Sequence, residues 1–283
     1  MKTKIIKSII FVLIFSWSMF SCEEFLEENP TDRITTKNFY QNKDHAEAAV
    51  YAIYNQLFGL YERLSFLISE LPTDVEKNGR GMPNQYLQNL EFARHSTENP
   101  FIRNWWQNNY RGISRANTAI NQLPNIDMDE NLKNQYIAEA RFLRALFYFN
   151  CVRYWGDVPL ITKLETVQDA MIPRSPKDEV YNLIIEDLTF AENNLPVNNA
   201  AATRATEGAA KILLGKVYLT RENWQACVGK LEEVISNESQ YGYGLHEDFG
   251  DNWRKSTEAG VEAVLRVDFA DPPLNGNGAM QLQ

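Results

Sequence analysis

Apolar residues recur three and four positions apart along most of the chain, which is the spacing that one face of an α-helix requires. The longest such stripe consists of Leu132, Tyr136, Ala140, Leu143, Phe147, Cys151 and Tyr154, and a second one beside it contains Phe142, Leu146 and Phe149. A helix that is apolar on two faces has to be covered on both. The pattern therefore predicts an interior helix over residues 131–155 of a layered helical protein, ended by Gly156 and Pro159.

Five further segments share this period. We expect a helix over each of them: residues 44–57, 102–123, 176–193, 203 or 206 to 220, and 224–237. Polar residues at their beginnings, and at that of the long helix, predict N-caps, because a side-chain oxygen there accepts a hydrogen bond from a free backbone N–H. The expected caps are Asp44, Asp127, Ser175, Thr203 or Thr206, and Asn223.

Two segments depart from the helical period. Residues 69–100 are rich in Pro, Gly and Asn, so we expect a polar loop there. Residues 262–269 form a short apolar run between Gly260 and Pro272, which favours a short strand near the C-terminus.

Internal repetition is weak. Residues 214–218, Leu-Gly-Lys-Val-Tyr, and the later Cys227, Leu231 and Val234 have the spacing of one tetratricopeptide unit, in which two antiparallel helices nest. In that unit Gly215 would lie where the helices approach. Half-units precede it at Leu188, Ala191 and Pro196 and at Ala119 and Pro124. The marks favour a tetratricopeptide-like helical solenoid, with an ordinary helical bundle as the alternative.

The first residues have the pattern of a signal peptide. Lys2, Lys4 and Lys7 precede an apolar run over residues 9–20, which is too short for a membrane-spanning helix. The run ends at Ser21-Cys22, the arrangement that bacterial lipoprotein processing requires, so we expect Cys22 to carry the lipid. A plain secretory signal with an unmodified Cys22 is the alternative. Four acids follow as part of an acidic tether: Glu23, Glu24, Glu27 and Glu28.

Composition excludes several functions. The net charge of -9 argues against a nucleic-acid partner, which would require a basic surface. Three scattered cysteines are too few for a disulfide framework or a zinc site, and Cys151 and Cys227 are expected to be buried thiols. Residues 127–138 lack the glycine and final glutamate of a calcium loop. No nucleophile or phosphate-binding motif is present, so we expect no enzyme, no cofactor and no metal.

Several stretches, in order along the chain, resemble the SusD/RagB family of lipoproteins. They are Ser21-Cys22 with residues 23–30, Thr36 with Asn38-Phe39-Tyr40, residues 104–117, residues 139–149, residues 154–160, and Arg204-Ala205-Thr206 with residues 209–214. The resemblance implies a mainly α, tetratricopeptide-like scaffold. It also implies an outward-facing, lipid-anchored protein of the outer membrane, which captures oligosaccharide or peptide nutrients and passes them to a SusC-like TonB-dependent transporter.

The resemblance suggests a division of the chain. We expect a signal peptide over residues 1–21, an acidic tether and entry segment over 22–43, a helical domain over 44–261, and a short strand and tail over 262–283. Family members continue into a second half, so the tail is expected to begin a truncated one. A fragment, a frameshifted gene and a natural short form remain alternatives. A tetratricopeptide-type adaptor that binds protein partners and no nutrient is the competing function.

Candidate ligand residues lie in the polar stretch. Sugar capture requires aromatic faces and hydrogen-bonding groups, and in the family the equivalent loop lies near the ligand, so we expect Asp74, Arg80 and Tyr86 to contact it. A solvated loop without contact is the alternative. Trp105 and Trp106 point about 100° apart on a helix, so at least one belongs to the core. Arg141 and Arg144 are expected to pair with carboxylates between helices.

Overall fold

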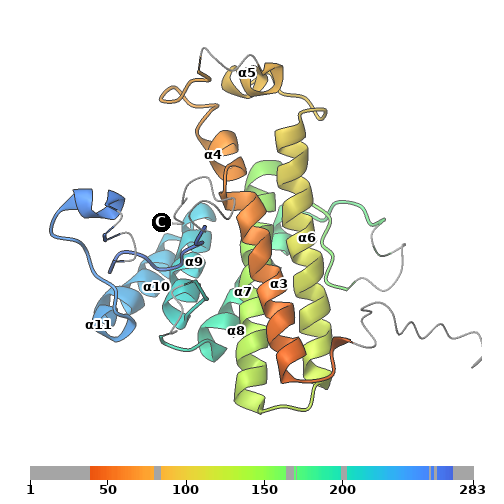
Figure 1. Ribbon diagram of the computed structural model, residues 1–283, viewed down its shortest axis with the longest axis vertical. Helices are drawn as coiled ribbons and strands as arrows, with labels where there is room; N and C mark the ends of the chain where they lie inside the picture. Colours follow the sequence, from red (N-terminus) through yellow and green to blue (C-terminus); the bar gives the residue numbers. More distant parts are fainter. Residues whose placement is uncertain are drawn as a thin grey trace, which may run out of the picture. The chain divides into compact units, whose positions relative to one another are not determined.

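The computed structural model describes residues 39–79, 84–163, 169, 171–198, 203–254, 256–257 and 260–269. The chain divides into two units, residues 1–40 and 41–283, and the second one contains the helices described below (Figure 1). The signal peptide, Cys22, the acidic segment that follows it and Arg80 lie outside the described residues. No helix among the described residues combines the length and the apolar character needed to span a membrane.

The second unit is mainly α-helical, as predicted. Its elements are α3 (Lys43–Tyr61), α4 (Leu64–Ser69), α5 (Gln85–Glu91), α6 (Pro100–Gln122), η3 (Leu123–Asn125), α7 (Glu130–Trp155), α8 (Lys177–Asn194), α9 (Glu207–Thr220), α10 (Trp224–Ser236), α11 (Glu238–Tyr241) and the 3₁₀-helix η5 (Phe249–Trp253). From α6 to α10, each long helix packs against the next, and α3 packs against α6 and α7 (Figure 1). Neighbours in sequence are therefore neighbours in space, which is the organisation of a helical solenoid.

Helix α7 is the interior helix that the two apolar stripes predict. Every residue from Tyr136 to Val152 is buried except Arg141. The helix ends at Gly156, whose φ of 65° is a conformation that glycine adopts without steric cost. The thiols of Cys151 and Cys227 are free and buried, as expected.

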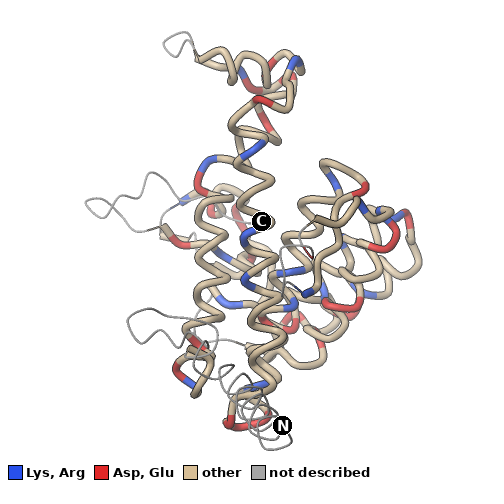
Figure 2. Tube along the Cα trace, turned by 90° about the vertical axis from the view of Figure 1, so that its right-hand side faces the viewer, with Lys and Arg blue, Asp and Glu red and all other residues tan. Residues whose placement is uncertain are grey.

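Two arginines of α7 pair with α8, as predicted. The Arg144 guanidinium donates two hydrogen bonds of 2.7 Å to the buried Asp187 carboxylate and one of 2.8 Å to Asn117 Oδ1 on α6. Arg141 Nη1 lies 3.3 Å from Glu186 Oε1. Removing one member of such a buried pair leaves the other charge uncompensated, so these contacts fix how α6, α7 and α8 sit together. Elsewhere, charges of both signs are interspersed along the helices (Figure 2).

Several caps differ from the prediction. Asn42 caps α3 in place of Asp44, and Asp129 caps α7 in place of Asp127, because the helices begin where these side chains accept from His45 N and Leu132 N. Thr206 and Asn223 cap α9 and α10 as expected.

The predicted Ser175 cap is also wrong. Ser175 forms an isolated antiparallel bridge with Val158. The N-cap residue of α8 is Pro176, which has no side chain that could accept a hydrogen bond from the helix. The Asp157 carboxylate takes over this role and accepts from Lys177 N at 2.8 Å. The end of α7 is thereby tied to the beginning of α8.

The stretch 69–100 contains a helix where we expected only loop. Asn84 caps α5, and Leu87 and Leu90 on one face of this helix pack against Leu67 and Leu71 in a small separate core. Two buried leucines are enough to order this short helix once a neighbouring apolar surface is supplied. The sequence window alone is too polar to reveal it.

The expected strand over residues 262–269 is not formed. Leu265 and Val267 are buried, but the segment has no ladder partner among the described residues. Ala263 N donates to Gly260 O in a local turn, and just before the segment Gly244 N donates to Val261 O. An apolar run becomes a strand only when another segment pairs with its backbone groups.

The α9–α10 hairpin packs as the tetratricopeptide spacing predicts. A Cβ added to Gly215 would lie 2.7 Å from Leu231 Cδ2 on the facing helix. The two helices can therefore approach this closely only because position 215 has no side chain.

We expect Gly215→Leu to lower the free energy of unfolding by about 1–3 kcal/mol, because the new side chain overpacks this contact. Gly229→Leu is the matched control, since a Cβ at Gly229 meets no atom within 4 Å. Urea unfolding of both variants measures the difference. Equal stability of the two would contradict the assigned contact.

Candidate functional site

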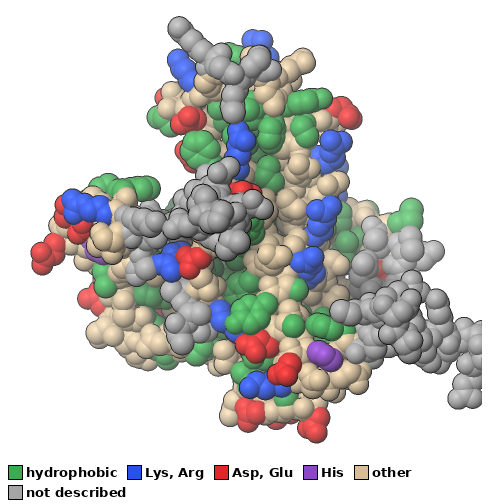
Figure 3. Space-filling model, in the orientation of Figure 1, with side chains coloured by type: hydrophobic (Ala, Val, Ile, Leu, Met, Phe, Trp, Pro, Cys, Tyr) green, Lys and Arg blue, Asp and Glu red, His purple; other side chains and the backbone are tan. Residues whose placement is uncertain are grey.

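A cavity of about 460 Å³ lies where α4, α5, the beginning of α6 and the end of α7 meet. It is lined by Ile68, Pro72, Leu90, His95, Ser96, Thr97, Ile102, Trp105, Tyr154 and Trp155. The volume lies within the range of about 300–1,000 Å³ of small-molecule pockets, which are mostly apolar with a few polar groups. None of the described residues that line it is an Asp, Glu, Lys or Arg. On the face drawn in Figure 3, apolar side chains gather over the same region, around α4 and the beginning of α6.

Aromatic rings form one wall of the cavity. Trp105 is 2% exposed, and its ring meets Tyr154 edge-on, with centroids 5.9 Å apart, and Tyr61 likewise at 6.1 Å. Tyr154 is 42% exposed and so presents part of its ring to solvent. Burial raises the pKa of Tyr154, so the phenol stays protonated at neutral pH. Because the two rings meet edge-on and Trp105 is buried, the accessible aromatic surface at this contact is that of Tyr154, and Trp105 supports it from behind.

The second tryptophan contacts a different set of rings, which is joined to the first through the contact between Tyr154 and Trp155 at 6.0 Å. Trp106 stacks on Tyr110 with centroids 4.6 Å apart and meets Trp155 edge-on at 4.8 Å. The expectation that at least one of the adjacent tryptophans belongs to the core is confirmed by the burial of Trp105.

A chain of buried amides holds Trp105 in place. Asn109 Nδ2 donates to the Trp105 carbonyl at 2.8 Å, and Asn150 Nδ2 donates to Asn109 Oδ1 at 3.2 Å and to the Tyr61 hydroxyl at 3.0 Å. Arg153 Nη2 completes the chain by donating to Asn150 Oδ1 at 3.2 Å. The cavity wall is thus supported from behind by groups on α3, α6 and α7.

One polar atom of this wall is unsatisfied. The Trp105 indole Nε1 is buried and has no hydrogen-bond partner among the described residues. Buried donors nearly always have an acceptor, so an unpaired one is unusual inside a packed protein.

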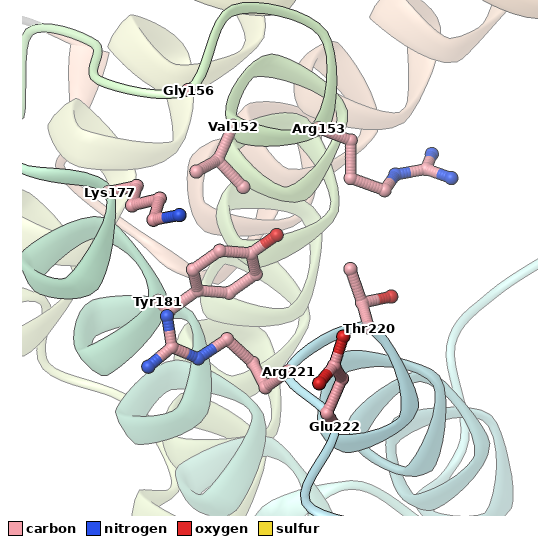
Figure 4. A pocket seen from close by; sticks show the side chains of 8 residues that line it. All are labelled: Val152, Arg153, Gly156, Lys177, Tyr181, Thr220, Arg221 and Glu222. Carbon is pink, nitrogen blue, oxygen red and sulfur yellow. The ribbon is translucent and has the colours of Figure 1, made fainter.

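A second cavity, of about 450 Å³, has a different chemical character. It lies at the end of α7, the beginning of α8 and the end of α9, and Figure 4 shows Lys177 and Arg153 on opposite sides of the Tyr181 ring. Arg221 lies over the same ring at 4.8 Å and pairs with Asp178. Partial burial and the charge of Arg153 lower the pKa of the nearby Lys216. Cations dominate the described lining of this cavity, and Glu222 offsets part of their charge. None of these described residues has a buried donor without a partner.

A third cavity, of about 470 Å³, lies between α7 and α8 and is lined largely by Asn and Gln side chains without any aromatic ring. Among the described residues, no group of three or more His, Cys, Asp or Glu side chains is placed to hold a metal ion. Of these three cavities, judged by their described lining residues, the first presents an aromatic ring that is partly open to solvent, that of Tyr154.

Comparison with known proteins identifies the family. A SusD-like family, described as starch-binding and associating with the outer membrane, matches residues 24–219. The chain belongs to the SusD-like family. The resemblance found in the sequence is therefore confirmed.

Relatives and solved structures of the SusD-like family agree. A SusD-like protein of Formosa agariphila is 29% identical over 279 residues, 94% of this chain and 52% of its own length, and one of Bacteroides ovatus is 29% identical over 256 residues, 88% of this chain and 45% of its own. The structure of a laminarin-binding SusD-like protein has a TM-score of 0.73 at 31% identity, covering 81% of this chain and 51% of that protein. One solved with a xylogluco-oligosaccharide has a TM-score of 0.65 at 25% identity, covering 80% of this chain and 46% of that one. The chain thus spans about half the length of these proteins.

The ligand residues expected in this SusD-like chain are not brought together in the cavity. Asp74 lies in an exposed turn after α4, and Tyr86, which is 46% exposed, lies in the first turn of α5. Neither is among the residues that line the cavity, although Pro72 and Leu90, which lie just before Asp74 and just after Tyr86 in the sequence, do line it. Arg80 lies outside the described residues.

Sequence reasoning missed Tyr154 and Trp155 as site residues. The available signal was an aromatic pair at the very end of a helix, just before Gly156. An aromatic side chain in the last turn of a helix can extend past the neighbouring helices and stay partly exposed.

We expect Asn150→Leu to lower the free energy of unfolding by about 1–3 kcal/mol, because it leaves Asn109 and the Tyr61 hydroxyl without their buried partner. Thermal unfolding measures the loss. Asn134→Leu is the matched control on the same helix, since Asn134 is only partly buried. Equal melting temperatures of the two variants would show that the buried amide hydrogen bonds do not contribute to stability.

Proposed function

We propose that this SusD-like protein binds oligosaccharide in the aromatic cavity and takes part in nutrient uptake at the outer membrane. The observation that carries the proposal is the Tyr154 ring, which is 42% exposed and lines the cavity, because the apolar face of a sugar ring packs on aromatic surface while its hydroxyls require polar groups at the edge. His95, Ser96 and Thr97 at the rim supply such groups. The laminarin and xyloglucan ligands in the names of two similar structures support the same class of ligand.

In this proposal the protein binds the sugar and does not hydrolyse it. Glycoside hydrolysis requires two carboxyl groups placed across the sugar, and none of the described residues that line the cavity bears one. A captured sugar is therefore released unchanged, which suits delivery to a SusC-like transporter in the same membrane. Oligopeptide is the alternative nutrient.

The proposed location rests on the beginning of the chain. A signal peptide over residues 1–21 followed by Cys22 would anchor the protein by lipid, and the acids after Cys22 are the sequence feature that favours an outward-facing protein. The family description, association with the outer membrane, supports this placement.

One observation favours the competing function, an adaptor for protein partners. Helix α10 exposes three large apolar side chains on one face: Trp224, Val228 and Ile235, at 59%, 54% and 67%. A protein whose only ligand contacts that face would bind no sugar, and substitutions in the aromatic cavity would leave it unaffected.

We expect Tyr154→Ala to weaken binding of laminari- or xylogluco-oligosaccharide about tenfold, equivalent to about 1.4 kcal/mol, because the ring supplies accessible stacking surface. Isothermal titration calorimetry on the chain from residue 22 measures the change. Trp253→Ala is the control, since Trp253 is an exposed aromatic residue outside the cavity. Asp74→Ala and Tyr86→Ala test whether the sequence-predicted residues extend the site. Unchanged affinity in Tyr154→Ala would place the ligand elsewhere, and absence of sugar binding would favour the adaptor.

We expect Cys22→Ala to abolish incorporation of labelled fatty acid and to release the protein from the outer-membrane fraction. The lipid would be attached to the sulfur of Cys22, which alanine lacks. Ser21→Ala serves as the control, because a small residue before the cysteine is retained. Equal labelling of wild type and Cys22→Ala would show that the segment is an ordinary signal peptide.

A further inference from the structure

The second cavity, of about 450 Å³, carries an inference about charged ligands. Its described lining includes three cations from three elements: Arg153 at the end of α7, Lys177 at the beginning of α8 and Arg221 just after α9 (Figure 4). The chain has 37 acidic side chains against 28 basic ones. Because carboxylates are in excess, a group of cations that converges without pairing to them stands out.

Two of the three cations have no carboxylate partner. Arg221 forms an ion pair with Asp178, whereas the side chains of Arg153 and Lys177 take part in no ion pair among the described residues. The nearby Asp157 carboxylate accepts from the backbone N–H of Lys177, at 2.8 Å, and not from its ammonium group. The Lys177 ammonium is therefore available to a ligand.

The Arg153 guanidinium is held in place while part of it stays available. Its Nε donates to the Phe149 carbonyl at 3.3 Å, its Nη2 donates to Asn150 Oδ1 at 3.2 Å, and its plane lies 4.4 Å from the centroid of the Phe149 ring. A guanidinium has more N–H donors than these two bonds use, and those on Nη1 have no partner among the described residues. An arginine fixed in this way loses little conformational freedom when it binds an oxyanion.

The positive charges also act on one another. Lys216 lies one turn before Thr220, which lines the cavity, and its pKa is lowered first by partial burial and then by the charge of Arg153. Glu222 is the carboxylate of the described lining, and it forms no ion pair with any of these cations among the described residues. A bound anion would reduce the repulsion that Lys216 experiences.

The end of α7 connects this cavity to the aromatic one. Arg153 and Gly156 line the cationic cavity, while Tyr154 and Trp155, which lie between them in the sequence, line the aromatic cavity. Burial raises the pKa of Tyr154, and the charge of Arg153 opposes that effect, so Arg153 is close enough to act on the phenol. A glycan that packs on the Tyr154 ring therefore has cations beside it.

We propose that the cationic cavity binds the carboxylate or sulfate group of an acidic sugar unit, through Arg153 Nη1 and Lys177 Nζ. Guanidinium and ammonium groups form strong, charge-assisted hydrogen bonds with such oxyanions. Arg221, already paired with Asp178, adds positive charge nearby. The inference rests on the proposed function in one respect, because it takes the ligand to be a glycan.

The main test is calorimetry on the full chain with oligogalacturonate and with xylogluco-oligosaccharide of similar length. We expect Lys177→Gln to weaken oligogalacturonate binding about fivefold, the size of one partly exposed ion pair, and to leave binding of the neutral sugar unchanged. Lys43→Gln is the matched control, because Lys43 is exposed, begins helix α3 as Lys177 begins α8, and changes the net charge equally. Its affinity for both sugars is expected to equal that of the wild type.

Two further probes separate the sugar from its charge. Oligoglutamate presents the same number of carboxylates on a peptide, and sodium sulfate is a free oxyanion. We expect both to bind at least tenfold more weakly than oligogalacturonate, because sulfate makes only one contact and a flexible peptide loses more conformational entropy than a sugar chain. Equal affinity for oligoglutamate would overturn the assignment of the cavity to a glycan.

The outcomes separate this inference from the function on which it rests. If oligogalacturonate binds Lys177→Gln and Lys43→Gln equally well, or does not bind at all, while neutral sugar binding depends on Tyr154, the inference is wrong and the proposed function stands. If Lys177→Gln alone weakens oligogalacturonate binding and Tyr154→Ala leaves neutral sugar binding unchanged, the cationic site stands and the aromatic one is wrong. Absence of binding to every sugar overturns both.

Discussion

Helix α7 offers almost no surface to water, and every polar side chain on its buried stretch must therefore find a partner inside the protein. Glu139 accepts from Arg204 at 2.8 and 2.9 Å, Arg144 pairs with Asp187, and Asn150 bonds Asn109 and Tyr61. Each of these partners belongs to a different neighbour of α7. Because an unpaired buried charge costs several kcal/mol, the register of the surrounding helices is set by these contacts as well as by apolar packing.

The aromatic cavity depends on the same helix. Asn150 is the link between the buried contacts of α7 and the wall of the cavity, since it holds Asn109, which in turn holds Trp105. One turn later, α7 ends and presents Tyr154 and Trp155 to the cavity. A site placed at the end of a fully packed helix inherits its rigidity, while its outermost rings remain accessible. This combination suits binding of a ligand that must later be released.

Prediction from the sequence succeeded where a long periodic signal was present. The stripes of α7 and the Gly215 contact of the α9–α10 hairpin follow from side-chain spacing alone, and the structure confirms both. Helix starts were less certain, because Asn42 and Asp44, or Asp127 and Asp129, are equally able to cap. Which one does so depends on where the packed face of the helix begins. Helix α5 was not predicted because its two leucines are buried only by their contact with Leu67 and Leu71, which the sequence pattern does not show.

The sequence by itself determined the helical class, the interior helix, the buried arginines as partners of carboxylates, and the family. Tertiary structure alone decided that Trp105 and Tyr154, which lie on different helices, share one wall, and that Asp74 and Tyr86 do not line it. It also decided that residues 262–269 form no strand among the described residues. The physical reason is common to all three. Periodicity reports which face of a segment is buried, whereas ring contacts and strand pairing depend on what another segment brings to that face.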